Sequence, residues 1–232
     1  MYIVTAELTR RKKRFRHVLP GFAFDLTASD PEDGQPWDFS KKAKQEKARR
    51  IVREQRPYML IGSPMCTHFS TWTYLNDAKT KDTEKLRRAR KKAIQHIEFM
   101  VSLYEEQLAA GRYFLHEHPR YATSWQLRRM AHLMATPGVE LAHGDQCQYG
   151  SVIRRGQQVG DPVKKPTGFL TNSPEVYNQL SRRCSGRGGL TLYPIDRIEG
   201  KVRSSRYLPE YPSSGLCVLR WISASSSATC TP

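Results

Sequence analysis

Residues 56–70 read Arg-Pro-Tyr-Met-Leu-Ile-Gly-Ser-Pro-Met-Cys-Thr-His-Phe-Ser, and they predict a buried strand that ends in a reactive loop. The apolar run at residues 58–61 has the length of a strand buried on both faces, and Gly62-Ser63-Pro64 breaks it abruptly. Cys66 therefore follows the carboxyl end of this strand. Ligand clefts form at that end in open parallel sheets, so Cys66 is a candidate nucleophile as well as a candidate small core residue.

A second strand of the same kind follows one helix later. Residues 80–110 have the apolar period of a long helix, and Gly111 is a natural stop signal. Residues 112–115, Arg-Tyr-Phe-Leu, predict another buried strand, which leads into Glu117 of His-Glu-His-Pro. The carboxyl ends of neighbouring parallel strands lie at one edge of a sheet, so Cys66 and Glu117 are expected to lie close together. The apolar face of the helix comprises Ile94, Ile97, Val101, Tyr104 and Leu108.

Strands and helices alternate over most of the chain, which predicts an α/β fold with a mostly parallel sheet flanked by helices. Asp25 lies near the end of an earlier strand, Asp38 lies just before a helix, and Ser40 is the expected N-cap of that helix. We expect a basic segment at 1–20, an α/β domain at 21–190 and an irregular, partly disordered tail at 191–232. The remaining expected elements are strands at 21–26, 139–142 and 169–170 and helices at 41–55, 124–135 and 175–180.

The charge of the chain is strongly positive, with 38 lysines and arginines against 22 acidic residues and a formal net charge of +16. The cations gather at residues 10–16, 41–56, 79–92 and 154–165. Such a surface favours a polyanion, and nucleic acid is the first candidate partner. No apolar run is long enough for a membrane span or a signal-peptide core, so we expect an intracellular protein that is nuclear in a eukaryote and otherwise cytoplasmic. The five cysteines are widely spaced and argue against a disulfide framework.

Three motifs occur in an order that resembles the cytosine-C5 DNA methyltransferases. Residues 63–70, Ser-Pro-Met-Cys-Thr-His-Phe-Ser, are similar to the Pro-Cys loop of that family, Gly-Pro-Pro-Cys-x-x-Phe-Ser. The family then has a strand that ends in Glu-Asn-Val and a later segment Tyr-Gly-x-Pro-Gln-x-Arg-x-Arg. Here Glu117 of His-Glu-His-Pro and then Tyr149-Gly150, followed by Arg154 and Arg155, stand in the same order. The resemblance covers roughly residues 21–172 and implies a Rossmann-like methyltransferase sheet.

The resemblance also implies roles for individual residues. Cys66 would add to C6 of a flipped cytosine, so that C5 becomes electron-rich enough to take a methyl group from S-adenosylmethionine. Glu117 would hold the N3 edge of the base and stabilise the charge that builds on the ring. Arg155 lies near the position of the catalytic-loop arginine of the family. Asp25 and Asp38 fall where the family contacts the ribose and adenine of the cofactor, and Pro64 of the Pro-Cys loop is placed with them.

The chain also departs from the family pattern. Nothing like the Gly-rich cofactor turn, Phe-x-Gly-x-Gly, precedes Gly21, and His118 replaces the Asn of Glu-Asn-Val. We therefore expect a truncated or divergent member whose sheet is incomplete at the N-terminus, similar to modules of mobile-element polyproteins that carry Gly-Ser-Pro-Met-Cys-Thr and His-Glu-His-Pro. The alternative is a catalytically inactive, basic remnant that binds nucleic acid. Its affinity for DNA should fall steeply as the salt concentration rises.

A zinc site is a third hypothesis, because several pairs of zinc-type ligands occur in the chain. Residues two apart in an extended segment point the same way, so one pair can supply two ligands. The spacings match no common zinc signature, however, and we expect no metal. The pairs are Cys66 with His68, His116 with His118, and His143 with Cys147.

Overall fold

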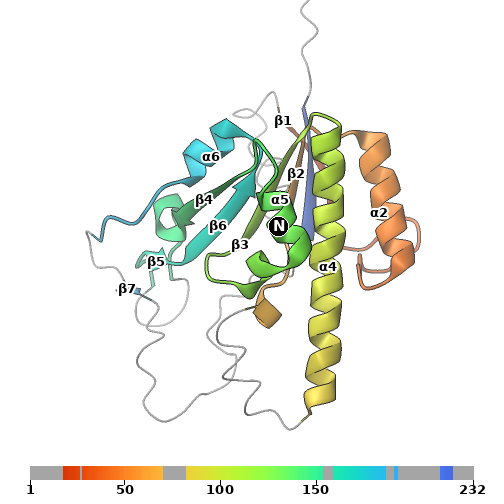
Figure 1. Ribbon diagram of the computed structural model, residues 1–232, viewed down its shortest axis with the longest axis horizontal. Coiled ribbons are helices and arrows are strands. Elements are labelled where there is room, and N and C mark those ends of the chain that lie inside the picture. Colours follow the sequence, from red (N-terminus) through yellow and green to blue (C-terminus); the bar gives the residue numbers. More distant parts are fainter. Residues whose placement is uncertain are drawn as a thin grey trace, which may run out of the picture.

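The computed structural model describes residues 18–26, 28–69, 82–153, 159–186, 191–192 and 215–221, and for 18–20, 191–192 and 215–221 it describes the backbone only. Most of the expected basic segment 1–20 and much of the expected tail lie outside these residues. The described chain forms an α/β fold around one sheet of six strands, with helices packed against it (Figure 1).

The six-stranded sheet has the order β1-β8-β2-β3-β6-β4. Strands β2 and β3 form its parallel pair, and every other pair of neighbours in it is antiparallel. It follows that β1, β2, β3 and β4 all run in the same direction, with β8 and β6 inserted between them in the opposite one. The bounds are β1 Val18–Asp25, β2 Met59–Ser63, β3 Tyr113–Pro119, β4 Glu140–Asp145, β6 Pro166–Thr171 and β8 Gly215–Trp221, and a separate parallel pair joins β5 Val163–Lys164 to β7 Thr191–Leu192.

Two expectations about the sheet differ from what the structure shows. The sheet is mixed, so the expected mostly parallel arrangement is not confirmed. Where a helix separates two strands, as between β2 and β3, the strands run parallel, but the described chain between β4 and β6 has no α-helix and β6 returns antiparallel. Residues 215–221, expected within an irregular tail, form β8 inside the sheet, hydrogen-bonded to both the edge strand β1 and β2.

The helices agree closely with the expected ranges. The bounds are α2 Lys42–Gln55, α4 Thr83–Ala109, α5 Arg128–Met134 and α6 Pro174–Leu180, with 3-10 turns at η1 Thr67–Phe69, η2 Thr123–Gln126 and η3 Gln146–Tyr149. Gly111 has a φ of 65° and ends α4 as expected. Ser40 is not the N-cap of α2, because that position falls to Lys41, whose side chain makes no capping hydrogen bond.

Helix α4 packs directly on the parallel pair, at Gly62 of β2. A methyl group at Gly62 would overlap the hydroxyl of Tyr104 and the terminal methyl of Met100, both on α4. The Tyr104 ring stacks on Phe114 of β3 with a centroid distance of 4.7 Å. Glycine at this strand position therefore lets the helix approach the sheet closely enough to contact both strands.

The two faces of the sheet are covered by different helices. Gly168 of β6 lies against Trp125 of η2, on the face that α4 and α5 cover. The backbone carbonyl of Leu180, at the end of α6, lies against Gly144 of β4. Gly144 pairs with Thr167, so it lies one row of paired residues away from Gly168. Because neighbouring rows of a sheet face opposite sides, α6 covers the other face.

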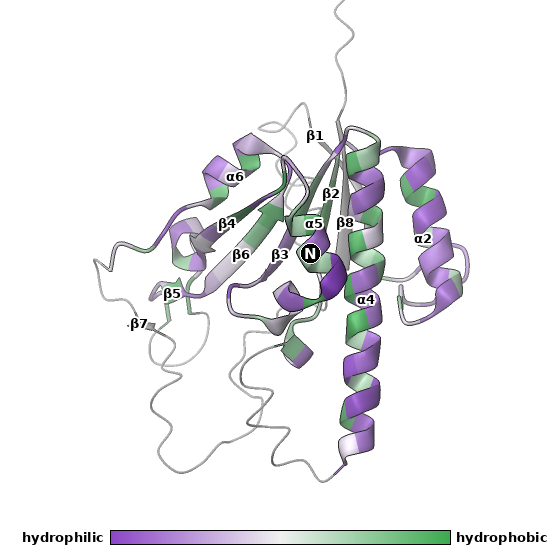
Figure 2. Cartoon of the chain, in the orientation of Figure 1, coloured by the Kyte–Doolittle hydropathy of each residue, from purple (hydrophilic) through white to green (hydrophobic). Residues whose placement is uncertain are grey.

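The first half of α4 extends beyond the sheet (Figure 1). The buried residues of this helix begin at Ile97, and the preceding three turns are mostly hydrophilic (Figure 2). Because α4 runs antiparallel to the strand before it, this half projects past the carboxyl ends of β2 and β3. Its exposed cations are Lys85, Arg87, Arg88, Arg90, Lys91 and Lys92. In the part of the chain that the structure describes, no helix combines the length and apolarity of a membrane span.

The contact at Gly62 gives a first prediction. The variant Gly62→Ala should lower the free energy of unfolding by about 1–3 kcal/mol, because the new methyl group has to displace Tyr104 and Met100. In the double variant Gly62→Ala/Tyr104→Phe the overlapping hydroxyl is gone, so its loss of stability should be smaller than the sum of the two single losses. Urea denaturation of the four proteins measures this, and strict additivity would contradict the proposed overlap.

Candidate functional site

Two of the expected site residues, Asp25 and Glu117, lie in one row across the carboxyl ends of the strands. Gly215 of β8 pairs with Asp25 at the end of β1 and with Ser63 at the end of β2. Ser63 is in turn hydrogen-bonded to Glu117 on β3. Neighbouring strands lie about 4.8 Å apart, so the row from Asp25 to Glu117 spans roughly 15 Å. The parallel pairing of β2 with β3 confirms the expectation that the two strand ends are neighbours.

Glu117 is held by its neighbour through one carboxylate oxygen. The hydroxyl of Ser63 donates to Oε2 of Glu117 at 2.5 Å. The other oxygen, Oε1, is buried and has no hydrogen-bond partner among the described residues. A buried carboxylate oxygen without a partner is costly for a folded chain, so this oxygen is the natural contact point for a donor from a ligand.

Cys66 lies in the loop that follows Ser63, just before the turn η1. The backbone N–H of Phe69 closes this loop onto the carbonyl of Cys66 at 2.9 Å, and the buried Phe69 ring packs edge-on against His118 with a centroid distance of 5.8 Å. Burial raises the pKa of the Cys66 thiol; Lys165 lowers it and Glu117 raises it further. The thiol is therefore within electrostatic range of both residues and is protonated at neutral pH in the isolated protein.

His116 and His118 lie on the opposite face of β3 from Glu117. They alternate with Glu117 along the strand, and both are buried in the core beneath α4 and η2. The hydroxyl of Tyr104 hydrogen-bonds Nδ1 of His116 at 3.2 Å, and that of Ser124 bonds Nδ1 of His118 at 2.6 Å. Burial lowers both pKa values, that of His118 to about 4 and that of His116 well below its ordinary value. These histidines are thus neutral core residues.

The zinc hypothesis finds no site within the described ranges. No group of three or more histidine, cysteine or acidic side chains there is arranged to hold a metal ion. The pair His116 and His118 is occupied by hydroxyl contacts within the core instead.

The two expected cofactor carboxylates, Asp25 and Asp38, both lie near His96 of α4. Burial lowers the pKa of His96 to about 4, and the charges of Asp38 and Asp25 oppose this shift. Oδ1 of Asp38 accepts from the backbone N–H of Ser40 at 2.9 Å. Burial raises the pKa of Asp38, but hydrogen bonds from Ser40 and the nearby cations Lys41 and Lys92 leave it below its ordinary value. Asp38 is half-buried, whereas Asp25 is only 1% exposed, so Asp38 is the more accessible to a ligand.

Of the remaining expected residues, the structure describes Pro64 and Tyr149. Pro64 is buried at the start of the Cys66 loop. Arg155 lies outside the described residues. Tyr149 follows β4 in η3 and braces the end of α6, because its hydroxyl donates to the carbonyl of Gln179 at 3.3 Å and accepts from the backbone N–H of Arg182 at 3.2 Å. Its contacts are therefore structural and do not reach the row at the strand ends.

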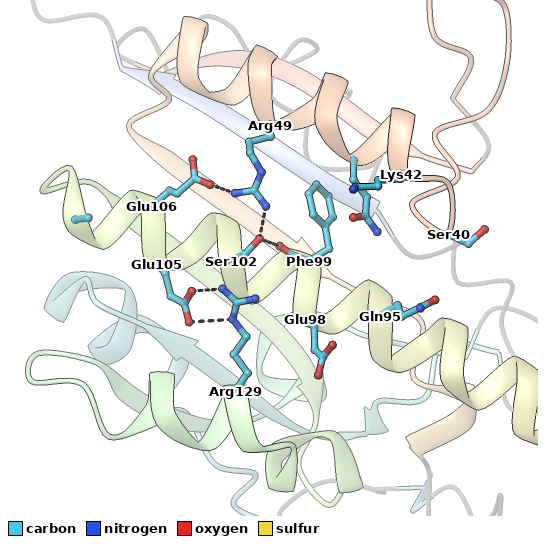
Figure 3. Close-up of a pocket in the computed structure, with 12 residues that line it drawn as sticks. Ser40, Lys42, Arg49, Gln95, Glu98, Phe99, Ser102, Glu105, Glu106 and Arg129 are labelled. Atoms are coloured by element: carbon cyan, nitrogen blue, oxygen red, sulfur yellow. Dashed lines mark hydrogen bonds and ion pairs between the residues drawn. The ribbon is translucent and has the colours of Figure 1, made fainter.

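A groove of about 700 Å³ lies elsewhere, between α2, α4 and α5 (Figure 3). Sequence reasoning missed it, because its polar lining is indistinguishable from an ordinary solvated helix face. Arg49 donates to the hydroxyl of Ser102 at 2.7 Å and pairs with Glu106, while Arg129 pairs with Glu105 at 2.5 Å. Each of these two arginines is thus paired with a carboxylate of the groove itself. No residue at the ends of the strands lines the groove.

Comparison of the chain with protein-family models, with curated proteins and with solved structures finds no match.

Three histidines with lowered pKa values predict acid sensitivity. The pKa values of His96, His116 and His118 lie below the value of about 6.5 expected in the unfolded chain, so the unfolded state binds more protons below that pH. Stability should be full above pH 6.5 and fall between pH 6.5 and 4, by about 1.4 kcal/mol per pH unit for each histidine. Urea titrations at several pH values measure this slope.

Two variants test the assignment of this slope. The variant His118→Asn, which retains a polar group beside Ser124, should have a shallower dependence between pH 6.5 and 4. The variant His132→Gln changes an exposed histidine of α5 and should keep the parental slope. Equal slopes in all three proteins would show that the buried histidines do not carry the effect.

Proposed function

We propose that this chain is a cytosine-C5 DNA methyltransferase-like domain in which Cys66 adds to a cytosine that Glu117 holds. The observation that carries the proposal is the hydrogen bond from Ser63 to Glu117, because it joins the ends of two parallel strands beside the Cys66 loop. The motif order in the sequence supports the same assignment. The sheet differs from the mostly parallel sheet that the resemblance implies, because β8 and β6 run antiparallel to their neighbours inside it.

The chemistry follows from the two oxygens of Glu117. Ser63 occupies Oε2 and fixes the carboxyl group, which leaves the buried Oε1 for the N3 edge of a cytosine. When the sulfur of Cys66 bonds to C6, negative charge builds on the ring, and a hydrogen bond or proton at N3 stabilises it. A base inside a duplex cannot reach this edge, so the nucleotide would have to be extruded from the stack.

Cys66 needs activation before it can act as a nucleophile. Burial raises its pKa, and only the thiolate attacks. Lys165 lowers this pKa and is the cation placed to favour the thiolate, whereas an ionised Glu117 opposes it. Protonation of Glu117, or its hydrogen bond to a base, removes that opposing charge. Occupation of the base site would thereby make Cys66 more reactive.

The cofactor expected for this reaction is S-adenosylmethionine, which would supply the methyl group. The low pKa of Asp38 keeps it an ionised acceptor suited to hydroxyl or amino donors. Asp25 lies two strands from Ser63 in the same row, but the groups that cover it would have to move before it could contact a ligand. We therefore assign cofactor contact first to Asp38, with Pro64 at the boundary between the cofactor and Cys66.

A second candidate function is nucleic-acid binding without catalysis. The raised pKa of Cys66 favours it, because a protonated thiol is a poor nucleophile. The exposed cations on the first half of α4 serve this function equally well, since they project past the strand ends where the bases would bind.

Methyl transfer distinguishes the two candidates. Full-length protein incubated with labelled S-adenosylmethionine and cytosine-containing DNA should transfer label, and Cys66→Ala should abolish transfer because no adduct can form. Glu117→Gln retains a hydrogen bond to Ser63 but cannot donate a proton, so we expect a loss of about 10²–10⁴-fold. Cys147→Ala removes a thiol remote from the row and serves as the matched control. No transfer by the parent, with no cofactor bound, would remove the enzymatic proposal.

The role of α4 is tested by the salt dependence of DNA affinity. Each of Arg90→Ala, Lys91→Ala and Lys92→Ala should reduce the slope of log affinity against log salt by about one unit wherever the cation contacts a phosphate. Arg50→Ala, which removes an exposed cation from the second half of α2, should leave the slope unchanged. Binding by fluorescence anisotropy at several salt concentrations gives the slopes, and identical slopes would exclude α4 from the interface.

A further inference from the structure

Two cysteines that the proposed function does not use lie against each other at the outer edge of the sheet. Cys147 is in η3, directly after β4, and Cys184 follows α6. Both are free thiols of intermediate burial, and the Cys184 thiol lies near enough to Cys147 to raise its pKa. The two residues are 37 positions apart in the chain, so this contact depends on the folded arrangement of β4, β6 and α6.

A set of hydrogen bonds holds the two segments together around the thiols. The backbone N–H of Cys184 donates to Oδ2 of Asp145 at 2.8 Å, and that of Asp145 donates to the carbonyl of Arg182 at 2.9 Å. Tyr149 lies two residues after Cys147, and its hydroxyl bridges the backbones of Gln179 and Arg182. Residues on both sides of Cys147 are thus tethered to Cys184 and to the residues just before it, which keeps the two cysteines close together.

We propose that Cys147 and Cys184 form a redox modification site, in which a peroxide converts the two thiols into a disulfide that fastens the end of α6 to η3. The hydrogen bonds between Asp145 and residues 182–184 bring the two segments together, so that the two thiols can approach to the sulfur–sulfur bond length of about 2 Å. The neighbouring backbone is fixed by hydrogen bonds and need not rearrange.

The reaction balances with hydrogen peroxide as the oxidant. The thiolate of one cysteine attacks a peroxide oxygen, a sulfur–oxygen bond forms, the oxygen–oxygen bond breaks, and the departing hydroxide takes up a proton to leave as water. The second thiolate then attacks the oxidised sulfur, the sulfur–sulfur bond forms, and the oxygen leaves as a second water. Two thiols and one peroxide give one disulfide and two waters, and a thiol reductant reverses the change.

The disulfide would close a ring that contains β6 and α6. Strand β6 lies next to β3, and its Phe169 pairs with Glu117. Closing the ring restricts the unfolded chain more than the folded one, so oxidation stabilises the sheet edge that adjoins Glu117. Burial and the contact with Cys184 raise the pKa of Cys147, so the reaction should accelerate as the pH rises from 7 to 9.

The experiment oxidises the full chain with a stoichiometric amount of hydrogen peroxide and maps peptides without reduction. We expect a monomer lighter by two hydrogens, a peptide pair joined through Cys147 and Cys184, and a melting temperature higher by on the order of 5 °C. Cys66→Ser should give the same result, whereas Cys147→Ser and Cys184→Ser should give neither the joined peptides nor the shift. Dithiothreitol should restore the parental melting temperature.

Three outcomes would overturn the proposal. The first is a disulfide that uses Cys66, Cys217 or Cys230 in place of this pair. The second is a cross-link between two molecules. The third is accumulation of sulfinic acid at Cys147 or Cys184 with no joined peptide, because a partner thiol in contact should capture the first oxidised sulfur before further oxidation. The result does not depend on methyl transfer, so it stands or fails separately from the proposed function.

Discussion

The close approach of helix α4 to strand β2 at Gly62 is the contact on which the arrangement of the chain depends. A larger residue there would push Tyr104 and Met100 away, and with them the helix that connects β2 to β3. Because α4 is the crossover between these strands, its position sets their parallel pairing. That pairing in turn brings Ser63 into contact with Glu117. The absence of a side chain at Gly62 therefore lets α4 lie close to β2 and β3, whose pairing places Ser63 against Glu117.

Alternation along β3 separates two kinds of polar chemistry that are adjacent in the sequence. His116 and His118 face the core under α4, where hydroxyl groups satisfy one nitrogen of each ring. Glu117 faces the opposite side, where Ser63 holds one of its oxygens. The motif His-Glu-His suggests a cluster of three cooperating groups, but the pleat of the strand makes the histidines structural and leaves the glutamate available. A strand can thus place a functional carboxylate beside buried imidazoles without joining them.

Sequence reasoning could predict the elements whose signals are local. The apolar residues before Cys66 and Glu117 predict β2 and β3, and the long run of apolar residues at helical spacing predicts α4. From these elements it follows that the ends of β2 and β3 are neighbours. The position of β8 could not be predicted, because residues 215–221 are placed by pairing with β1 and β2, nearly 200 and about 155 residues earlier in the chain. The neutral state of His116 and His118 could not be predicted either, because their burial and their contacts with Tyr104 and Ser124 depend on the tertiary structure. The expected Ser40 N-cap is wrong because the helix begins at Lys42, which makes Lys41 the N-cap residue.

The place of β8 has a consequence for the order in which the molecule is built. Strands β2, β3, β6 and β4 form one block of neighbours and all precede residue 172, so they can pair as soon as the ribosome releases them. Strand β1, although it is made first, has no neighbour in this sheet except β8 and must wait until residues 215–221 emerge. Until then β1 and the free edge of β2 are open to pairing with other chains. The row from Asp25 to Glu117 is therefore completed only after residues 215–221 have been made.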